Sequence, residues 1–143
     1  MIIFKTVDVE KAYLPIRGTK KSAGYDFRIP EDVVIKPGET YTVDSGIQLR
    51  LTDEHEHYVG LMFIRSSLGI KKHLRVSNSV GVIDADYEDN IRIALHNYGK
   101  EPVRLEKFEK VVQMVFVPYG FNTQIRDYIS EERTGGVGST GKF

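Results

Sequence analysis

Short segments in which apolar and polar residues alternate recur along this chain, and this pattern constrains its fold more than any other feature. No segment combines three turns of helical apolar spacing with capping residues, and only residues 66–72 suit a short helix. The expected strands cover residues 1–9, 41–51, 58–64, 76–83, 91–98, 103–108 and 111–117. Many short strands at close spacing are typical of an all-β sandwich or barrel, which is the fold class that the sequence predicts.

The composition narrows the range of partners. The chain has 143 residues, which fits one domain, and its 20 Lys and Arg balance 20 Asp and Glu. No overall field therefore attracts nucleic acid or a membrane surface, so a bound polyanion needs a local group of donors. Cysteine is absent, which excludes disulfides and a cysteine nucleophile. With no apolar run near about 20 residues and no signal-peptide pattern, we expect a cytoplasmic protein that binds no nucleic acid and no membrane.

The segment Asn78-Ser79-Val80-Gly81-Val82-Ile83-Asp84-Ala85-Asp86-Tyr87 changes from apolar β-branched residues to carboxylates within one residue. Gly81 would allow another chain or a ligand to approach the backbone closely. A carboxylate at the end of a strand can hold a water molecule and accept its proton, which makes Asp84 a candidate general base. The alternative interpretation is an Asx-type turn that closes a hairpin.

Two other segments are suited to bind phosphate. Arg65-Ser66-Ser67-Leu68-Gly69 offers guanidinium and hydroxyl donors and a glycine that permits close backbone approach, although a helix N-cap beside a surface arginine would look the same. Residues 133–141 are rich in glycine, whose N–H groups can surround an anion, and they carry the donors of Arg133, Ser139 and Thr140. Such a composition is also typical of a disordered tail.

Three polar residues have no clear assignment from their own pattern. Gln113 interrupts an apolar run, where it could satisfy a backbone group or reach a ligand. His55 and His57 lie two residues apart with no third ligand nearby, so we expect them to be surface histidines.

Five segments, taken in order, resemble the motifs of the trimeric dUTP pyrophosphatases (dUTPases). They are Ala23-Gly24-Tyr25-Asp26, Arg65-Ser66-Ser67-Leu68-Gly69, Gly81-Val82-Ile83-Asp84-Ala85-Asp86-Tyr87, Val111-Val112-Gln113 and Arg133-Thr134-Gly135-Gly136-Val137-Gly138-Ser139-Thr140-Gly141. Each motif alone is weak, but five in this order make the resemblance specific. It extends from about residue 22 to residue 141 and so covers nearly the whole chain.

The resemblance implies a jelly-roll-like β-barrel of residues 1–129 and a flexible glycine-rich arm of residues 130–143 that closes over a neighbouring subunit's site. It also implies a homotrimer in which each active site combines motifs of all three subunits. In this family Mg²⁺ binds the triphosphate of dUTP, and water attacks the α-phosphorus to give dUMP and pyrophosphate. The reaction limits uracil incorporation into DNA and supplies dUMP for dTMP synthesis.

Carried over by position, the resemblance implies a role for each matching residue. Asp84 would orient and deprotonate the water, Tyr87 would pack under the deoxyribose, and Asp26 would act through the metal's water shell or as support. The uracil edge would be read by Asn78 and the backbone around it, Gly81 included. The phosphates would be held by Arg65, Ser66, Ser67, Gly69 and Gln113. The arm would close on the substrate through Arg133, Val137, Gly138, Ser139 and Thr140.

Three positions depart from the family's usual residues. Glu88-Asp89 follow Tyr87 where the family has Arg-Gly, and we expect these two charges to point away from a triphosphate. Phe108-Glu109-Lys110 stand where the fourth motif usually opens with Gly-Asp-Arg. The sequence therefore leaves undetermined whether the family's turn and one of its arginine contacts form here. Val137 stands in place of a phenylalanine that stacks on uracil, which should weaken base stacking.

The sequence leaves two alternatives to dUTP hydrolysis. A dCTP deaminase has the same fold and an Arg-Ser-Ser segment, but it uses a glutamate in a downstream pattern that this chain lacks. A regulatory nucleotide-binding protein of the same fold would use nucleotide occupancy as a switch, as some phage members of the family do, and would have a protein partner. The retained Asp84 favours catalysis.

Overall fold

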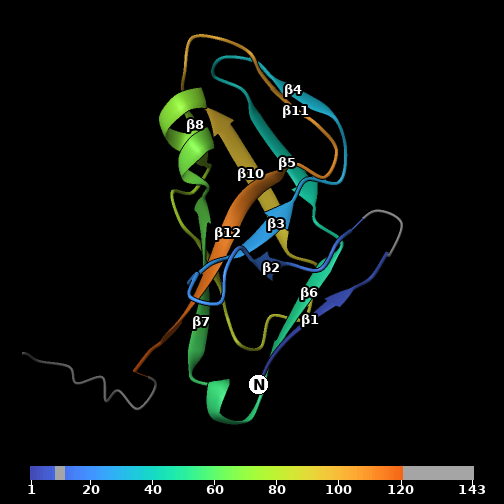
Figure 1. Cartoon of the computed structure of the whole chain (residues 1–143), viewed down its shortest axis with the longest axis vertical. Coiled ribbons are helices and arrows are strands. Elements are labelled where there is room, and N and C mark those ends of the chain that lie inside the picture. Colours follow the sequence, from blue (N-terminus) through green and yellow to red (C-terminus); the bar gives the residue numbers. More distant parts are fainter. Residues whose placement is uncertain (9–11, 121–143) are drawn as a thin grey trace, which may run out of the picture.

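The computed structural model describes residues 1–8 and 12–120, in which short strands dominate (Figure 1). The elements are β1 (Ile2–Thr6), β2 (Ile16–Arg17), β3 (Tyr25–Arg28), β4 (Val33–Ile35), β5 (Thr40–Asp44), β6 (Ile47–Leu51), η1 (Asp53–His55), β7 (Tyr58–Ile64), η2 (Ser67–Lys71), β8 (Leu74–Val76), β9 (Gly81–Ile83), β10 (Arg92–Asn97), β11 (Val103–Leu105) and β12 (Lys110–Pro118). The fold is all-β and jelly-roll-like, as predicted, and η2 is the short helix expected over residues 66–72. Within these described ranges no helix is long and apolar enough to cross a membrane.

The strands pair in four antiparallel sheets. A five-stranded sheet has the order β2-β3-β12-β7-β9, a three-stranded sheet has the order β5-β10-β8, and β1-β6 and β4-β11 are separate pairs. In the largest sheet β12 lies between β3 and β7, as Figure 1 shows. This arrangement places the fourth motif on β12 beside the end of the first motif on β3, and the second motif begins directly after the neighbouring β7.

The hydrophobic core follows from the alternation along the strands. Ile93 and Leu95 on β10, and Ile47, Leu49 and Leu51 on β6, are buried, whereas the residues between them are more exposed. Burial of an aliphatic side chain of this size contributes about 1.5–3 kcal/mol relative to leaving it exposed. The inward positions therefore hold the fold together, and the polar side chains emerge from the outer faces and the strand ends.

Two segments that were expected as single strands are interrupted. Residues 76–83 are divided between β8 and β9 by a turn in which Ser79 has a φ of 70°. Residues 41–51 are divided at Gly46, whose φ is 67° and whose N–H donates to Asp44 Oδ1 at 2.7 Å. Because the chain turns at Gly46, β5 and β6 belong to different sheets.

Candidate active site

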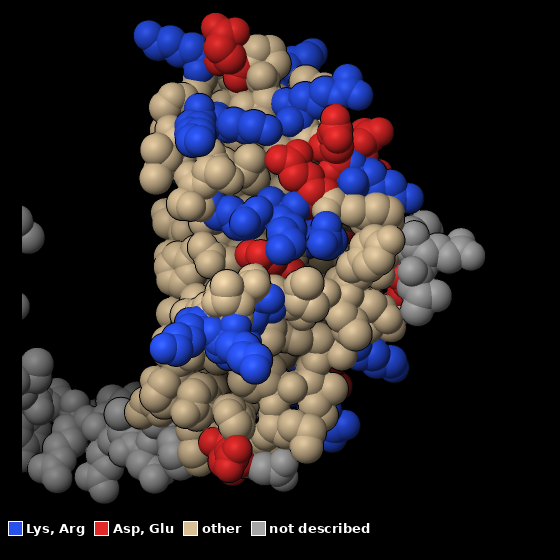
Figure 2. All heavy atoms as spheres, in the orientation of Figure 1, with Lys and Arg blue, Asp and Glu red and all other residues tan. Residues whose placement is uncertain are grey.

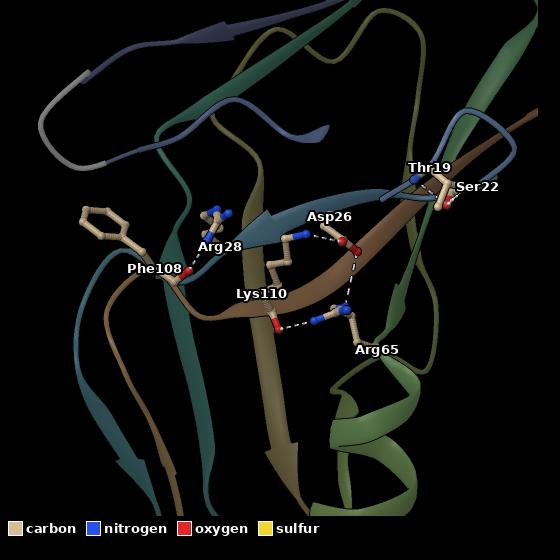
Figure 3. Close-up of polar contacts among 7 residues, drawn as sticks. All are labelled: Thr19, Ser22, Asp26, Arg28, Arg65, Phe108 and Lys110. Atoms are coloured by element: carbon tan, nitrogen blue, oxygen red, sulfur yellow. Dashed lines mark hydrogen bonds and ion pairs between the residues drawn. The ribbon is translucent and has the colours of Figure 1, made fainter. Parts of the chain in front are cut away.

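Asp26, Arg65 and Lys110 form a cluster of ion pairs at one end of the five-stranded sheet (Figure 3). Asp26 on β3 is nearly buried, and its two carboxylate oxygens lie 3.3 Å from Arg65 Nε and 3.0 Å from Lys110 Nζ. The Arg65 guanidinium also donates to the Lys110 carbonyl oxygen at 3.4 Å. Figure 2 shows lysine and arginine side chains gathered in the middle of this face around a small acidic area. The cluster fixes the direction of Arg65 while its side chain stays 36% exposed.

The backbone that carries Arg65 is held from both sides. The Arg65 N–H donates to the Val111 carbonyl oxygen on β12 at 3.1 Å, and the Arg65 carbonyl oxygen accepts from the N–H groups of Leu68 and Gly69 at 3.0 Å each. Leu68 of η2 is buried, and the Tyr98 hydroxyl donates to the Gly69 carbonyl oxygen at 2.9 Å. The predicted phosphate-binding segment is therefore a short helix anchored on the core.

Ser66 and Ser67 are exposed at the start of this helix, next to Arg65. Gly69 lies close to the end of β7, because a Cβ atom on it would approach Ile64 Cγ2 to 3.1 Å. Two exposed serines thus follow the partly exposed Arg65 directly in the chain. This arrangement suits an anion such as phosphate, which accepts several hydrogen bonds at once.

Gln113 lies beside the same cluster, since β12 pairs it with Asp26 on β3 and with Phe63 on β7. Its amide lies against Gly24: a Cβ atom on Gly24 would be 2.5 Å from Gln113 Oε1, closer than real Cβ contacts. Gly24 thus lets Gln113 lie over the start of β3. The predicted first, second and fourth motifs therefore meet in one place.

The turn before β12 contains the replacement Phe108-Glu109-Lys110. Phe108 has a φ of 67°, the left-handed conformation that glycine adopts without steric cost, and the family usually has glycine there. The Phe108 ring contacts the Tyr13 ring edge-on at a centroid distance of 4.6 Å, and its carbonyl oxygen accepts from Arg28 Nη1 at 2.8 Å. The turn forms despite the replacement, and Lys110 provides a cationic contact to Asp26.

Asp84 and Tyr87 lie elsewhere, in an open groove of about 1180 Å³. Asp84 follows β9 directly and is exposed; its carbonyl oxygen accepts from the Tyr87 N–H at 3.2 Å. Tyr87 is half-buried, and its hydroxyl donates to the Asn90 carbonyl oxygen at 3.2 Å, which leaves the ring to form part of the groove wall. The arrangement places a carboxylate and an aromatic ring within one tight turn.

Two further carboxylates lie near Asp84: Glu88 lines the groove together with Asp86. Asp89 does not line it. That Glu88 and Asp89 point away from a bound triphosphate stays a prediction.

Gly81 and Asn78 precede this turn. A Cβ atom on Gly81 would lie 3.1 Å from Met62 Cβ, so the glycine allows β9 to pack against β7. Asn78 is exposed in the turn between β8 and β9 and does not line the groove; its carbonyl oxygen accepts from the Val80 N–H at 2.8 Å. Arg133, Val137, Gly138, Ser139 and Thr140, and the arm of residues 130–143 with its boundary to residues 1–129, lie outside the described residues.

The two sets of predicted residues are separated within one chain. β7 pairs with β9 so that Gly60 faces Ile83, which places Asp84 beside Val59, whereas Arg65 follows the far end of β7. The six residue-to-residue steps of extended chain from Val59 to Arg65 span about 20 Å. Neither Arg65 nor Gln113 lines the groove of Asp84.

Sequence reasoning assigned no role to four residues of these sites. Lys110 pairs with Asp26 in the Arg65 cluster, and Lys5, Gln48 and Arg50 line the groove of Asp84 from β1 and β6. Alternation in the sequence can assign such residues to an outer face, but it cannot indicate which other strand that face meets. Among the residues described, no group of three or more His, Asp or Glu could hold a metal ion.

Comparison with known proteins assigns the family. The family model for dUTPase matches residues 10–141, so the chain belongs to the dUTPase family. It is 38% identical over 144 residues to the deoxyuridine 5'-triphosphate nucleotidohydrolase of Neisseria meningitidis serogroup C, covering 96% of this chain and 94% of that protein. The Bordetella pertussis protein of the same name is 35% identical over 150 residues, covering 96% and 99%.

Solved structures agree with this assignment. The dUTPase of Staphylococcus bacteriophage 80alpha, solved with dUPNHPP, superposes with a TM-score of 0.82 at 26% sequence identity and covers 99% of this chain and 98% of that one.

Proposed function

We propose that this protein hydrolyses dUTP to dUMP and pyrophosphate by attack of a water molecule on the α-phosphorus. The observation that carries the proposal is the position of Asp84, an exposed carboxylate that follows β9 and lines a groove large enough for a nucleotide. Family membership and the relatives named deoxyuridine 5'-triphosphate nucleotidohydrolase support the choice of substrate. No described feature favours dCTP deamination or a purely regulatory role.

Asp84 orients the water and accepts its proton, which makes the oxygen a better nucleophile. The Tyr87 ring supports the deoxyribose, since its hydroxyl is already engaged by Asn90 and its ring belongs to the groove wall. The backbone around Asn78 and Gly81 reads the uracil edge. A main-chain hydrogen bond from the Tyr87 N–H to the Asp84 carbonyl oxygen closes the turn between these two residues. The water and the sugar are therefore positioned by one turn of the chain.

Arg65, Ser66, Ser67, Gly69 and Gln113 hold the phosphates. Cleavage of a phosphoanhydride needs little covalent help from a protein; it needs positioned donors for the charge that develops on oxygen. Asp26 and Lys110 meet this need indirectly, because their ion pairs set the direction of the Arg65 guanidinium.

Mg²⁺ is the proposed cofactor, and when bound it neutralises charge on the phosphate oxygens. Mg²⁺ is commonly held by substrate phosphates, water and one or two carboxylates, which fits a protein whose described residues form no metal cage. Both oxygens of Asp26 already face cations at 3.3 and 3.0 Å, so we assign Asp26 mainly to the support of Arg65. Its contact with the metal's water shell stays a prediction.

We also propose a homotrimer with shared sites, and the separation of Asp84 and Arg65 within one chain supports the sharing of sites between copies. About 20 Å of strand β7 lies between them, which is too far for one phosphate chain to bridge, so in the proposed trimer a second copy brings its Arg65 cluster to the Asp84 groove. An apolar area on the outside of β7, β9 and β12 supports such contact: Leu61 pairs with Val115 and with Val82, which is 60% exposed. The arm of residues 130–143 would close the site of a neighbouring subunit through Arg133, Val137, Gly138, Ser139 and Thr140.

In the cell this activity would limit uracil incorporation into DNA and supply dUMP for dTMP synthesis. We place the protein in the cytoplasm, where nucleotides for DNA synthesis are made, because its curated relatives are bacterial dUTP nucleotidohydrolases. Neither nucleic acid nor membrane is part of the proposed function. A regulatory protein partner is proposed only for the case of phage origin.

The test combines product analysis with subunit mixing. The wild-type protein should release pyrophosphate from dUTP in Mg²⁺ and no ammonia from dCTP. Asp84→Asn should bind a non-hydrolysable dUTP analogue nearly as well as wild type but lose about 10²–10⁴-fold in kcat, because the amide cannot accept a proton. An Asp84→Asn protein that keeps more than about a tenth of the wild-type kcat would exclude Asp84 as the base.

The same variant tests the shared site. Chains with Asp84→Asn and chains with Arg65→Ala should each be inactive, yet mixed trimers should recover activity where an intact groove meets an intact Arg65 cluster. In the control experiment, Arg65→Ala chains are mixed with Asp32→Asn chains, because Asp32 is an exposed carboxylate outside both clusters. If mixing the two inactive variants restores no activity after subunit exchange, each site is built within one chain.

A further inference from the structure

The outer face of the β1–β6 pair carries two basic side chains into the groove of Asp84. β1 pairs with β6 so that Ile3 faces Arg50 and Lys5 faces Gln48, and these four residues alternate with the more buried positions of both strands. All four line the groove. Lys5 and Arg50 are diagonal neighbours across the pair, with backbones roughly 7–8 Å apart, so their long side chains can reach one ligand.

Neither cation is used within the described part of the chain. Lys5 and Arg50 are exposed, and no ion pair or hydrogen bond joins either side chain to another described residue. Arg65 and Lys110 differ in this respect, because Asp26 pairs with both. The charges on Lys5 and Arg50 are thus available to a ligand.

The other charged residues described in the groove are all acidic, so these two cations favour the binding of a polyanion there. Glu56, Asp84, Asp86 and Glu88 all line the groove, and Lys5 and Arg50 are the basic residues described along it. A triphosphate placed beside Asp84 would be repelled by these carboxylates. Two cations on the β1–β6 wall reduce that repulsion, and an arginine fork and a lysine ammonium both bind phosphate oxygens well.

We propose that Lys5 and Arg50 bind phosphate oxygens of the nucleotide whose α-phosphorus lies at Asp84, on the same subunit as Asp84. This proposal rests on the proposed function and adds to it a second group of phosphate ligands, apart from the Arg65 cluster. Both residues lie on paired strands whose inward side chains, Ile47, Leu49 and Leu51, are buried in the core. Their backbones are therefore fixed before the nucleotide binds, which lowers the entropic cost of binding.

The experiment measures binding, so that it does not depend on turnover. Affinities of wild type, Lys5→Met, Arg50→Met and the double variant are measured for α,β-imido-dUTP, dUMP and pyrophosphate, each with Mg²⁺. Arg92→Met on β10 and Arg104→Met on β11 are matched controls, because both arginines are exposed and neither lines the groove. Lys5→Arg and Arg50→Lys keep the charge and report on the shape of the wall.

Each methionine variant should weaken binding of α,β-imido-dUTP about tenfold, as expected for loss of one charge-assisted contact in a partly solvated site. Binding of dUMP should change far less than binding of the analogue. Pyrophosphate should compete poorly with α,β-imido-dUTP for the double variant. Added salt should weaken binding of the analogue to wild type more than to the double variant. The charge-preserving and control variants should stay near wild type.

Two outcomes would overturn the proposal. One is unchanged affinity of the double variant for α,β-imido-dUTP. The other is an equal loss for dUMP and for the analogue, which would assign both residues to the shape of the groove. Failure of the proposed function would look different: the wild type would release no pyrophosphate from dUTP, whatever the two methionine variants bind.

Discussion

Phe108 provides the sharpest test of the folding argument, because it has a left-handed backbone that favours glycine. Its φ is 67°, and this conformation costs a residue with a side chain roughly 1–2 kcal/mol. The turn keeps it there with hydrogen bonds from the Phe108 N–H to the Ile29 carbonyl oxygen at 2.7 Å and from Arg28 Nη1 to the Phe108 carbonyl oxygen at 2.8 Å.

The ring offsets part of this cost. Its edge-on contact with Tyr13 is worth about 0.5–1.5 kcal/mol, and the Lys107 ammonium, 4.8 Å from the ring centroid, adds about 0.5–1 kcal/mol. Phe108→Ala loses these contacts and keeps the strain, so it should lower the free energy of unfolding by about 1–2 kcal/mol. Phe108→Gly loses the same contacts but relieves the strain. The glycine variant should therefore be more stable than the alanine variant by about 0.5–1 kcal/mol, after the entropy of glycine in the unfolded chain is subtracted.

The measurement is urea unfolding at one protein concentration, since assembly makes apparent stability concentration-dependent. Lys107 is the control, because its φ is not positive and its N–H bond to Asp32 Oδ1 survives substitution. At position 107 the order should reverse, with glycine less stable than alanine by about 0.5–1 kcal/mol. If Phe108→Ala is as stable as Phe108→Gly, the turn stores no strain and the reasoning is wrong.

Two other predictions follow from buried or partly buried charges. Asp26→Asn should lower the free energy of unfolding, measured in urea, by about 1–3 kcal/mol. This loss is smaller than for a fully buried pair because the Arg65 and Lys110 side chains are 36% and 26% exposed. Asp32→Asn is the control, and an equal loss in both variants would contradict the role of Asp26. Burial and the hydrogen bond to Glu31 raise the pKa of Tyr41 above its usual value of about 10. The folded state then retains a proton that the unfolded state releases, so the stability from Tyr41 is present below about pH 10 and lost as the pH rises further. Tyr41→Phe should flatten that loss in unfolding measured between pH 9 and pH 11, about one unit either side of the usual pKa, and an unchanged slope would argue against it.

The sequence predicted those elements in which one periodicity dominates. Residues 91–98 alternate without a break, and β10 forms over Arg92–Asn97. Residues 76–83 were wrongly predicted as one strand because Val76, Val80 and Val82 all favour strands. The backbone around Ser79 instead turns with a positive φ. Local propensity could not decide between a strand and a turn there, since pairing of β8 with β10 and of β9 with β7 sets the break.

The candidate site was predictable in its residue types and not in its geometry. The resemblance singled out Asp26, Arg65 and Gln113, and the order β3-β12-β7 brings them together. Lys110 was recognised as a departure from the family, but its ion pair with Asp26 depends on the register shift between Lys110 and Val112. No pattern in the sequence indicated a role for Lys5 and Arg50, because only the pairing of β1 with β6 places them along the groove of Asp84.

The central place of β12 also has a consequence during synthesis on the ribosome. β12 covers Lys110–Pro118 and separates β3 from β7, so the early strands have no partner along those edges until the chain has been made to about residue 118. Pairing across such long sequence separations is slow, and an unpaired strand edge can pair with another nascent chain. We therefore expect this protein to fold after most of its chain has been translated. A nascent chain that stalls before β12 would be a target for chaperones and proteases.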